Sequence, residues 1–291
     1  MISNKAKAVF KAIEMIKFKE TMSFDHPRRT KLNYVPLVLY FKNDLVQLEI
    51  QGRNVYKIVP KDNPSDFHVV FFHGGGYAHE SSINHFLMIN KFVNLSNCRV
   101  TFVEYPLVPE ANVHQTLSMV KETYALLVDQ YPDHRFVIMG DSAGGGLALV
   151  LSMLIRDLKM KQPEKIVLMS PWLDISMTNP DIHLYDEKDL ILNLESLEDV
   201  GSRYAADLPK DDFRVSPIYG DLNHLGEILV LYGTDEVLKP DCDKFCQMQN
   251  LKGTHINCSV YEERLNRVFI RTSTCLRQPW MSAAATGTLP S

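Results

Sequence analysis

The chain has 291 residues, of which 45% are hydrophobic and 23% charged, so it is long enough for one large α/β domain with a sizeable core. Its formal net charge of −4 is small and gives no indication of a nucleic-acid or membrane-surface partner. The odd number of scattered cysteines fits neither a disulfide framework nor a metal site, so we expect reduced thiols at Cys98, Cys242, Cys246, Cys258 and Cys275.

The first part of the chain has mixed signals. Residues 1–20 have helical spacing of apolar residues, 21–34 are irregular and polar, and 35–41, 46–50 and 54–59 have strand-like patterns. No signal-peptide pattern and no run of roughly 18–20 apolar residues is present, so we expect a cytoplasmic protein without a membrane span.

From residue 67 onward, short apolar runs alternate with helical patterns. The runs at 67–72, 98–105, 135–140, 164–170, 226–233 and 255–261 predict buried strands, and helices are expected at 83–95, 115–130, 144–158 and 242–251. This alternation predicts a parallel sheet built from βαβ units. Between Ile175 and Ser216 no strand pattern occurs, which indicates a helical insertion over one end of the sheet.

The strongest chemical signal is Gly140-Asp141-Ser142-Ala143-Gly144, which has the form G-x-S-x-G. It directly follows a predicted strand and opens a predicted helix. A serine on such a sharp turn projects its hydroxyl away from the sheet, and the helix N-terminus places a positive dipole beside it. We therefore predict that Ser142 is a nucleophile; a plain glycine-rich turn is the alternative.

A second glycine-rich segment, His73-Gly74-Gly75-Gly76-Tyr77, follows another predicted strand upstream. Glycines allow several backbone N–H groups to point at one spot, as an oxyanion hole requires. The expected donors are the amides of Gly75, Gly76 and Ala143, whereas His73 is expected to orient the loop rather than carry a proton.

A third signal, Gly233-Thr234-Asp235-Glu236, ends the predicted strand 226–233. The expected chain order of the triad is serine, acid, histidine. Both Asp235 and Glu236 stand where the acid of a catalytic triad is expected, and the residues alone leave the choice open.

Six motifs in this order resemble the hormone-sensitive-lipase-like branch of the α/β hydrolases, which includes microbial carboxylesterases and acetyl esterases. They are HGGGY (73–77), EYPLVPE (104–110), GDSAGGG (140–146), SPWLD (170–174), SPIYGDL (216–222) and GTDEVLKPD (233–241). The resemblance covers residues from about 35 to 269. It implies that Tyr105 and Glu110 belong to a structural turn, that Trp172 and Asp174 lie beside the nucleophile, and that Glu236 is favoured as the acid.

The resemblance also implies a mostly parallel, eight-stranded sheet with an N-terminal helical cap, and hydrolysis of short-chain acyl esters through an acyl-enzyme. We expect one domain over residues 1–270, with 1–34 and 175–215 forming cap or insertion, and an irregular, disordered or non-native tail over 271–291. No metal or organic cofactor is expected. A small-molecule ester is the expected partner, and a homodimer is possible.

The expected catalytic histidine is missing from the sequence pattern. The family run M-x-H-x-F corresponds to Leu265–Phe269, which puts Arg267, or in a shifted alignment Asn266, at the histidine position. Neither side chain can act as a base. Two hypotheses follow: a carboxylesterase whose turnover is impaired, or a catalytically inactive binding protein with a hydrolase fold. A peptidase of this fold would need an additional large domain.

Overall fold

A computed structural model describes residues 19, 24, 27, 38–248 and 250–261. The described residues form one sheet of eight strands in the order β1-β2-β4-β3-β5-β6-β7-β8. The strands are β1 (Asn43–Ile50), β2 (Arg53–Pro60), β3 (Phe67–Phe72), β4 (Arg99–Val103), β5 (Arg135–Asp141), β6 (Lys165–Met169), β7 (Gly226–Gly233) and β8 (Thr254–Tyr261).

The pairs β1–β2 and β2–β4 are antiparallel, and the other pairs of this sheet are parallel. Strand β3 is buried at all six positions, which explains its unbroken apolar run FHVVFF. The register pairs Phe72 with Gly140, so the ends of β3 and β5 lie side by side. The glycine-rich segments after these two strands are therefore neighbours at the carboxyl edge of the sheet. The expected α/β-hydrolase architecture is confirmed.

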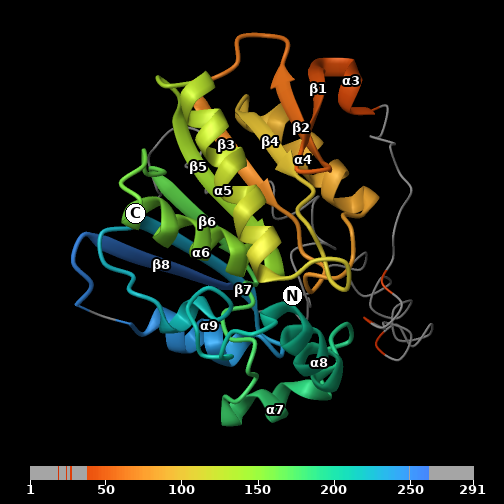
Figure 1. The fold of residues 1–291 in the computed structure, drawn as a ribbon, viewed down its shortest axis with the longest axis vertical. Helices are drawn as coiled ribbons and strands as arrows, with labels where there is room; N and C mark the ends of the chain where they lie inside the picture. Colours follow the sequence, from red (N-terminus) through yellow and green to blue (C-terminus); the bar gives the residue numbers. More distant parts are fainter. Residues whose placement is uncertain (1–18, 20–23, 25–26, 28–37, 249, 262–291) are drawn as a thin grey trace.

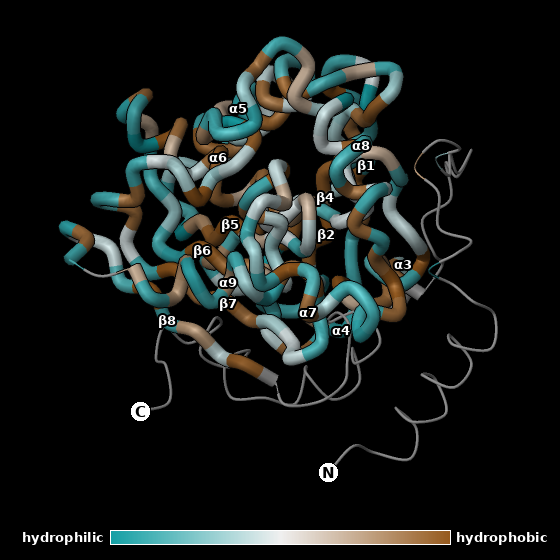
Figure 2. Tube along the Cα trace, turned by 90° about the horizontal axis from the view of Figure 1, so that it is seen from below, coloured by the Kyte–Doolittle hydropathy of each residue, from teal (hydrophilic) through white to brown (hydrophobic). Residues whose placement is uncertain are grey.

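Helices cover both faces of the sheet (Figure 1). One core includes residues of α5 (Val113–Gln130), α6 (Ala143–Asp157), α8 (Leu194–Ala205) and α9 (Lys239–Cys246). A second core, on the other face, joins the sheet to α3 (Val38–Lys42) and α4 (Ile83–Ser96). Figure 2 shows hydrophobic segments concentrated in the interior and hydrophilic segments in the surrounding loops.

Between β6 and β7 the chain forms a turn of 3₁₀-helix (Pro180–Ile182), α7 (His183–Asp186), α8 and a second 3₁₀ turn (Pro217–Tyr219). These helices lie at the end of the sheet where β7 finishes (Figure 1). The expected cap over 1–34 and the tail over 271–291 lie outside the described residues, apart from Lys19, Phe24 and Pro27. Lys19 Nζ lies 2.8 Å from Asp186 Oδ1, at the end of α7.

Three sequence expectations are wrong. Within the strand expected over 35–41, the described part begins helix α3 instead, and Leu39 contributes to the second core from this helix. The helix expected over 242–251 is α9, which begins earlier and ends at Cys246. Cys246 is not a reduced thiol, because it forms a disulfide with Cys258 of β8, across 12 residues. Spacing alone did not reveal this pair, since it depends on the packing of α9 against β8 in the folded chain.

Candidate active site

Ser142 occupies the sharp turn between β5 and α6. Its backbone has φ 52° and ψ −121°, an uncommon conformation for a residue with a side chain. The turn is tight because Gly140 and Gly144 lack side chains. A Cβ on Gly140 would lie 2.2 Å from Gly144 O, and one on Gly144 would lie 2.2 Å from Phe72 O. The G-x-S-x-G spacing is thus a packing requirement of this strained turn.

Backbone hydrogen bonds hold the turn rigidly. The Ser142 N–H donates to Met169 O at 2.9 Å, and the Ser142 carbonyl accepts from Gly146 at 3.1 Å and from Trp172 at 2.9 Å. Ser142 is only 4% exposed. The first helical residue, Ala143, has an N–H without an intrahelical acceptor, as at every helix start. The serine therefore sits beside an available amide and the positive end of α6.

The loop His73–Tyr77 lies directly against this turn. A Cβ on Gly74 would be 3.1 Å from Ser142 Cβ, so the two segments are in contact. Gly75 and Gly76 both have positive φ values, 126° and 61°. Among the described residues, neither of their N–H groups donates a hydrogen bond to another protein group. The geometry provides free backbone donors next to the serine, as an oxyanion hole needs.

His73 is fully buried beneath this loop. Its Nδ1 contacts Gly74 O at 2.6 Å, and its Nε2 lies 3.2 Å from Glu104 Oε2. Burial acts to lower the pKa of His73, but the Glu104 carboxylate outweighs it and the pKa is raised. Both ring nitrogens are engaged, which agrees with the expected orienting role.

Glu236 and Asp235 differ sharply in their surroundings. Glu236 is 2% exposed, and its Oε1 accepts a hydrogen bond from Ser170 Oγ at 2.9 Å. Asp235 is half-buried. Val237, the residue after Glu236, donates its N–H to Asp189 Oδ2 at 3.1 Å. Asp189 belongs to the insertion, so the insertion anchors the loop that carries Glu236.

Trp172 and Asp174 line the region behind the serine. The backbone N–H of Trp172 donates to the Ser142 carbonyl, and its indole Nε1 donates to Asp174 O at 3.0 Å. The indole stacks on Tyr77, with ring centroids 5.8 Å apart. Asp174 accepts from Tyr219 Oη at 2.6 Å. These contacts connect the nucleophile turn, the glycine loop and the motif at 216–222 into one buried unit.

Arg267 and Asn266, which stand at the expected histidine position, lie outside the described residues. His85 is buried near the serine turn, but its nitrogens are engaged. Nδ1 accepts from the Ser82 N–H at 2.8 Å, and Nε2 lies 3.5 Å from Asp141 Oδ1. His85 therefore has the geometry of a structural residue.

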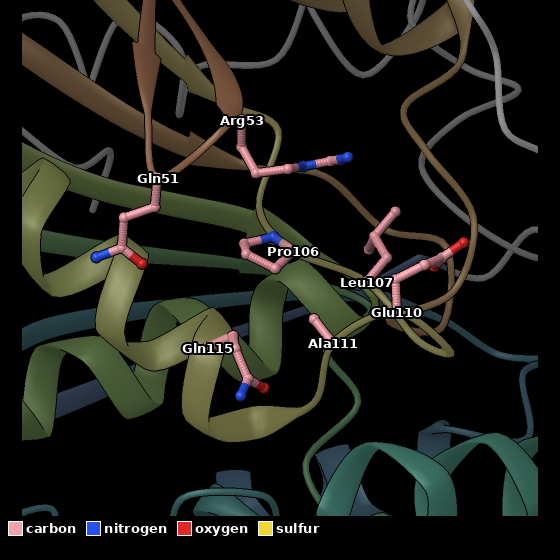
Figure 3. A pocket seen from close by; sticks show the side chains of 7 residues that line it. All are labelled: Gln51, Arg53, Pro106, Leu107, Glu110, Ala111 and Gln115. Atoms are coloured by element: carbon pink, nitrogen blue, oxygen red, sulfur yellow. The ribbon is translucent and has the colours of Figure 1, made fainter.

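A surface cavity of about 380 Å³ lies between the turn that joins β1 to β2 and the segment 106–115 (Figure 3). Its lining does not include the serine; it consists of Gln51, Arg53, Pro106, Leu107, Glu110, Ala111 and Gln115. Arg53 Nε donates to Glu104 O at 3.1 Å.

Within the described ranges, no cluster of three or more His, Cys, Asp or Glu side chains could hold a metal ion. A search of the helices in the same ranges finds none with the length and hydropathy of a membrane span.

Three supporting residues were not identified from the sequence: Glu104, Ser170 and Asp189. Glu104 belongs to the EYPLVPE motif and Ser170 to SPWLD, so the motifs contained a signal, but not the contacts. Asp189 lies in a segment without any motif. Each residue contacts a site residue far away in the sequence, which only the folded chain reveals.

Comparisons with known proteins agree with this geometry. A family model described as alpha/beta hydrolase fold matches residues 69–269. An esterase of Acinetobacter venetianus is 30% identical over 197 residues, covering 67% of this chain and 64% of that protein. An acetyl-hydrolase of Streptomyces hygroscopicus is 27% identical, covering 67% and 66%. The matches thus span slightly less than two thirds of these relatives.

The crystal structure of an esterase from the bacterial hormone-sensitive lipase family superposes with a TM-score of 0.79 at 23% identity, covering 98% of this chain and 96% of that chain. This likeness establishes the fold, and the family model covers more than half of the sequence. The likeness to the esterase from the hormone-sensitive lipase family agrees with the resemblance seen in the six motifs. Because the family model matches more than half of the sequence, the chain belongs to the α/β-hydrolase family.

Proposed function

We propose that this protein is a serine carboxylesterase that hydrolyses short-chain acyl esters. The observation that carries the proposal is the strained, buried Ser142 next to the N–H groups of Gly75 and Gly76, which donate to no other group in the described part of the chain. The names of the relatives, esterase and acetyl-hydrolase, support the same chemistry.

In the proposed reaction, Ser142 Oγ attacks the ester carbonyl carbon, and the carbonyl oxygen becomes an oxyanion. The amides of Gly75, Gly76 and Ala143 stabilise this charge. The C–O bond to the alcohol then breaks, the alcohol leaves with a proton, and water hydrolyses the acyl-enzyme. Glu236 is the proposed acid of the triad, because it is buried and held by Ser170, whereas Asp235 is more exposed.

Proton removal from Ser142 requires a base, and Arg267 stands where the family has histidine. Losing one triad member costs about 10⁴- to 10⁶-fold in kcat. We therefore propose slow turnover for this sequence. The second candidate function, a hydrolase-fold binding protein without turnover, is favoured by the same observation.

The test is hydrolysis of p-nitrophenyl acetate and butyrate by the full chain, by Ser142→Ala and by Arg267→His. We expect Arg267→His to raise the rate by several orders of magnitude, and Ser142→Ala to abolish that gain. The exposed Ser202→Ala is the matched control for serine removal. If every variant is inactive on both esters, the binding-protein function replaces the esterase.

The assignment of Glu236 as the triad acid is tested in the Arg267→His variant. Glu236→Gln should lower kcat by about 10⁴-fold, as loss of a triad carboxylate does, and Asp235→Asn should change it little. The opposite pattern would transfer the role to Asp235.

A further inference from the structure

Glu104, the residue just after β4, forms a buried ion pair with His73. Glu104 is 9% exposed and His73 is fully buried, and Glu104 Oε2 lies 3.2 Å from His73 Nε2. The contact is a charge pair rather than a well-aligned hydrogen bond. The other carboxylate oxygen, Oε1, accepts a hydrogen bond from Ser81 Oγ. The carboxylate is thus held on both sides against the imidazole.

The other ring nitrogen of His73, Nδ1, contacts the glycine loop His73–Tyr77. Its Nδ1 lies 2.6 Å from Gly74 O, and because a carbonyl oxygen can only accept, Nδ1 is the donor. The peptide between Gly74 and Gly75 is trans, so its N–H points away from its C=O. The hydrogen bond from His73 Nδ1 to the Gly74 carbonyl therefore sets the direction of the Gly75 N–H.

Further contacts restrain the same loop. The Gly74 N–H donates to Asp141 Oδ1 at 2.9 Å, and the His73 carbonyl accepts from Tyr105 Oη at 2.6 Å. The His73 ring stacks on Tyr105, with centroids 4.5 Å apart. These contacts hold His73 and the peptide before Gly74. Among the hydrogen bonds between described residues, the Gly74 carbonyl has only the one from His73, so this bond is the direct hydrogen-bond restraint on the peptide that carries the Gly75 N–H. The following peptide is held separately, because the Gly75 carbonyl accepts from the N–H groups of Ala78 and His79 at 3.1 and 2.9 Å.

We propose that Glu104 is a positioning residue: by holding His73 against the Gly74 carbonyl, it aims the Gly75 N–H at the position of the oxyanion. This inference rests on the proposed function for its chemical meaning, but the geometry can be tested without turnover. A charged donor on the carbonyl also polarises the peptide and makes its N–H a stronger donor to a developing negative charge.

The charge of His73 depends on the groups that face it. These are Glu104 after β4, Asp141 at the end of β5, His85 of α4, whose ring is 5.6 Å away, and the stacked Tyr105. Burial acts to raise the pKa of Glu104, but its pairing with His73 outweighs burial and lowers it. Removing the Glu104 charge leaves burial as the main influence, so His73 should then be neutral at pH 7.

The test is Glu104→Gln in the full chain, with Glu104→Asp as the variant that keeps the charge. Glu164→Gln is the control, because Glu164 pairs with Arg135 on the surface at the opposite end of the sheet. Two ¹⁵N signals are followed by NMR: the ring nitrogens of His73 and the amide of Gly75. We expect both to shift in Glu104→Gln, and both to stay near their original values in Glu104→Asp and Glu164→Gln.

Kinetics supply the second measurement, in the full chain and in Arg267→His. Glu104→Gln should lower kcat about 10-fold, less than the roughly 10²- to 10³-fold cost of deleting an oxyanion donor. KM should change by less than about threefold, because the Gly75 N–H stabilises the oxyanion that forms in the transition state and not the bound ester. Activity of the parent should also fall at alkaline pH as His73 loses its proton, a limb that Glu104→Gln should lack.

Failure of this inference is distinct from failure of the proposed function. An unchanged Gly75 amide signal in Glu104→Gln overturns the positioning role, whether or not the chain hydrolyses esters. A shifted signal in a protein that is inactive in every background supports the positioning role and removes the esterase. Equal losses of kcat in Glu104→Gln and Glu104→Asp would also contradict it, since the charge would then be irrelevant.

Discussion

Two buried histidines lie near opposite ends of strand β3, and their pKa values shift in opposite directions. They are His68, the second residue of the strand, and His73, the first residue after it. His68, near the start, is 2% exposed, with Nε2 2.7 Å from Thr101 Oγ1 and Nδ1 3.3 Å from His134 Nδ1. Burial, reinforced by His134, Arg99 and Lys57, lowers its pKa to about 3. His73, just beyond the other end, is even less exposed, yet its pKa is raised by Glu104.

The comparison teaches that the neighbouring groups, and not burial alone, decide whether the pKa of a buried histidine in this sheet is raised or lowered. Desolvation opposes the imidazolium at both positions. Only at the carboxyl end of β3 do the ends of β4 and β5 supply carboxylates, Glu104 and Asp141. The histidine with the raised pKa therefore lies next to the proposed oxyanion hole, and the histidine with the lowered pKa lies where the sheet has no proposed chemistry.

The largest expected effect comes from breaking the charged pair. Glu104→Ala leaves His73 buried without its counter-charge, so the free energy of unfolding should fall by about 3 kcal/mol. The matched change at the other end, His134→Ala, should cost less than about 1 kcal/mol, because His134 is half-buried and the pair is neutral. Urea unfolding at pH 7 measures both, and equal losses would contradict the contrast.

The pH dependence of stability should have opposite signs at the two ends. For His68, the unfolded chain binds a proton below about pH 6.5 and the folded chain only near pH 3, so stability falls on acidification through this window, by at most about 1.4 kcal/mol per pH unit. His68→Gln should remove most of this slope between pH 4.5 and 6.0, as measured by urea unfolding. An unchanged slope would mean that His68 is protonated in the fold.

For His73 the sign reverses, because its folded pKa is raised. Its contribution is complete below the unfolded pKa of about 6.5 and is lost as the pH rises through the folded pKa. The pKa of Glu104 is lowered, so its contribution is lost only as the pH falls through that lower value. Glu104→Gln should therefore reduce the loss of stability above neutral pH, in the same unfolding experiment.

Hydrogen-bond partners at the two ends should matter less than charge. Tyr105→Phe removes the donor to the His73 carbonyl, and Thr101→Val removes the partner of His68 Nε2. Each should cost about 1 kcal/mol of unfolding free energy, the usual value for one buried hydrogen bond. Only Tyr105→Phe should also lower kcat in the Arg267→His background. A kinetic effect of Thr101→Val would show that the two ends are coupled.

The smallest effect is expected from the exposed pair Arg135–Glu164. Its atoms approach to 2.7 Å, but both side chains are about 40% exposed. Glu164→Gln should change the free energy of unfolding by less than about 0.5 kcal/mol. A larger loss of unfolding free energy, measured by urea unfolding, would show that the short distance between the charged atoms matters more to the strength of this ion pair than their exposure to solvent.

Local backbone demands explain why the fold and the glycine motifs could be predicted from the sequence. Gly140 and Gly144 are required because any side chain would collide with backbone, and the buried strand β3 requires an unbroken apolar run. Contacts between distant segments could not be predicted in the same way. The disulfide Cys246–Cys258 and helix α3 depend on which elements become neighbours, and neither leaves a periodic pattern.

The sequence by itself determined the α/β class, the family, and the expectation that Ser142, Gly75, Gly76 and Ala143 form the reacting site, because each depends on short-range patterns. The tertiary structure showed that Glu236, which the resemblance favoured, is buried whereas Asp235 is half-buried. It also paired Glu104 with His73, and gave His68 and His73 opposite pKa shifts. Charge states in a buried site follow from the neighbours that folding supplies, and those neighbours come from strands far apart in the sequence.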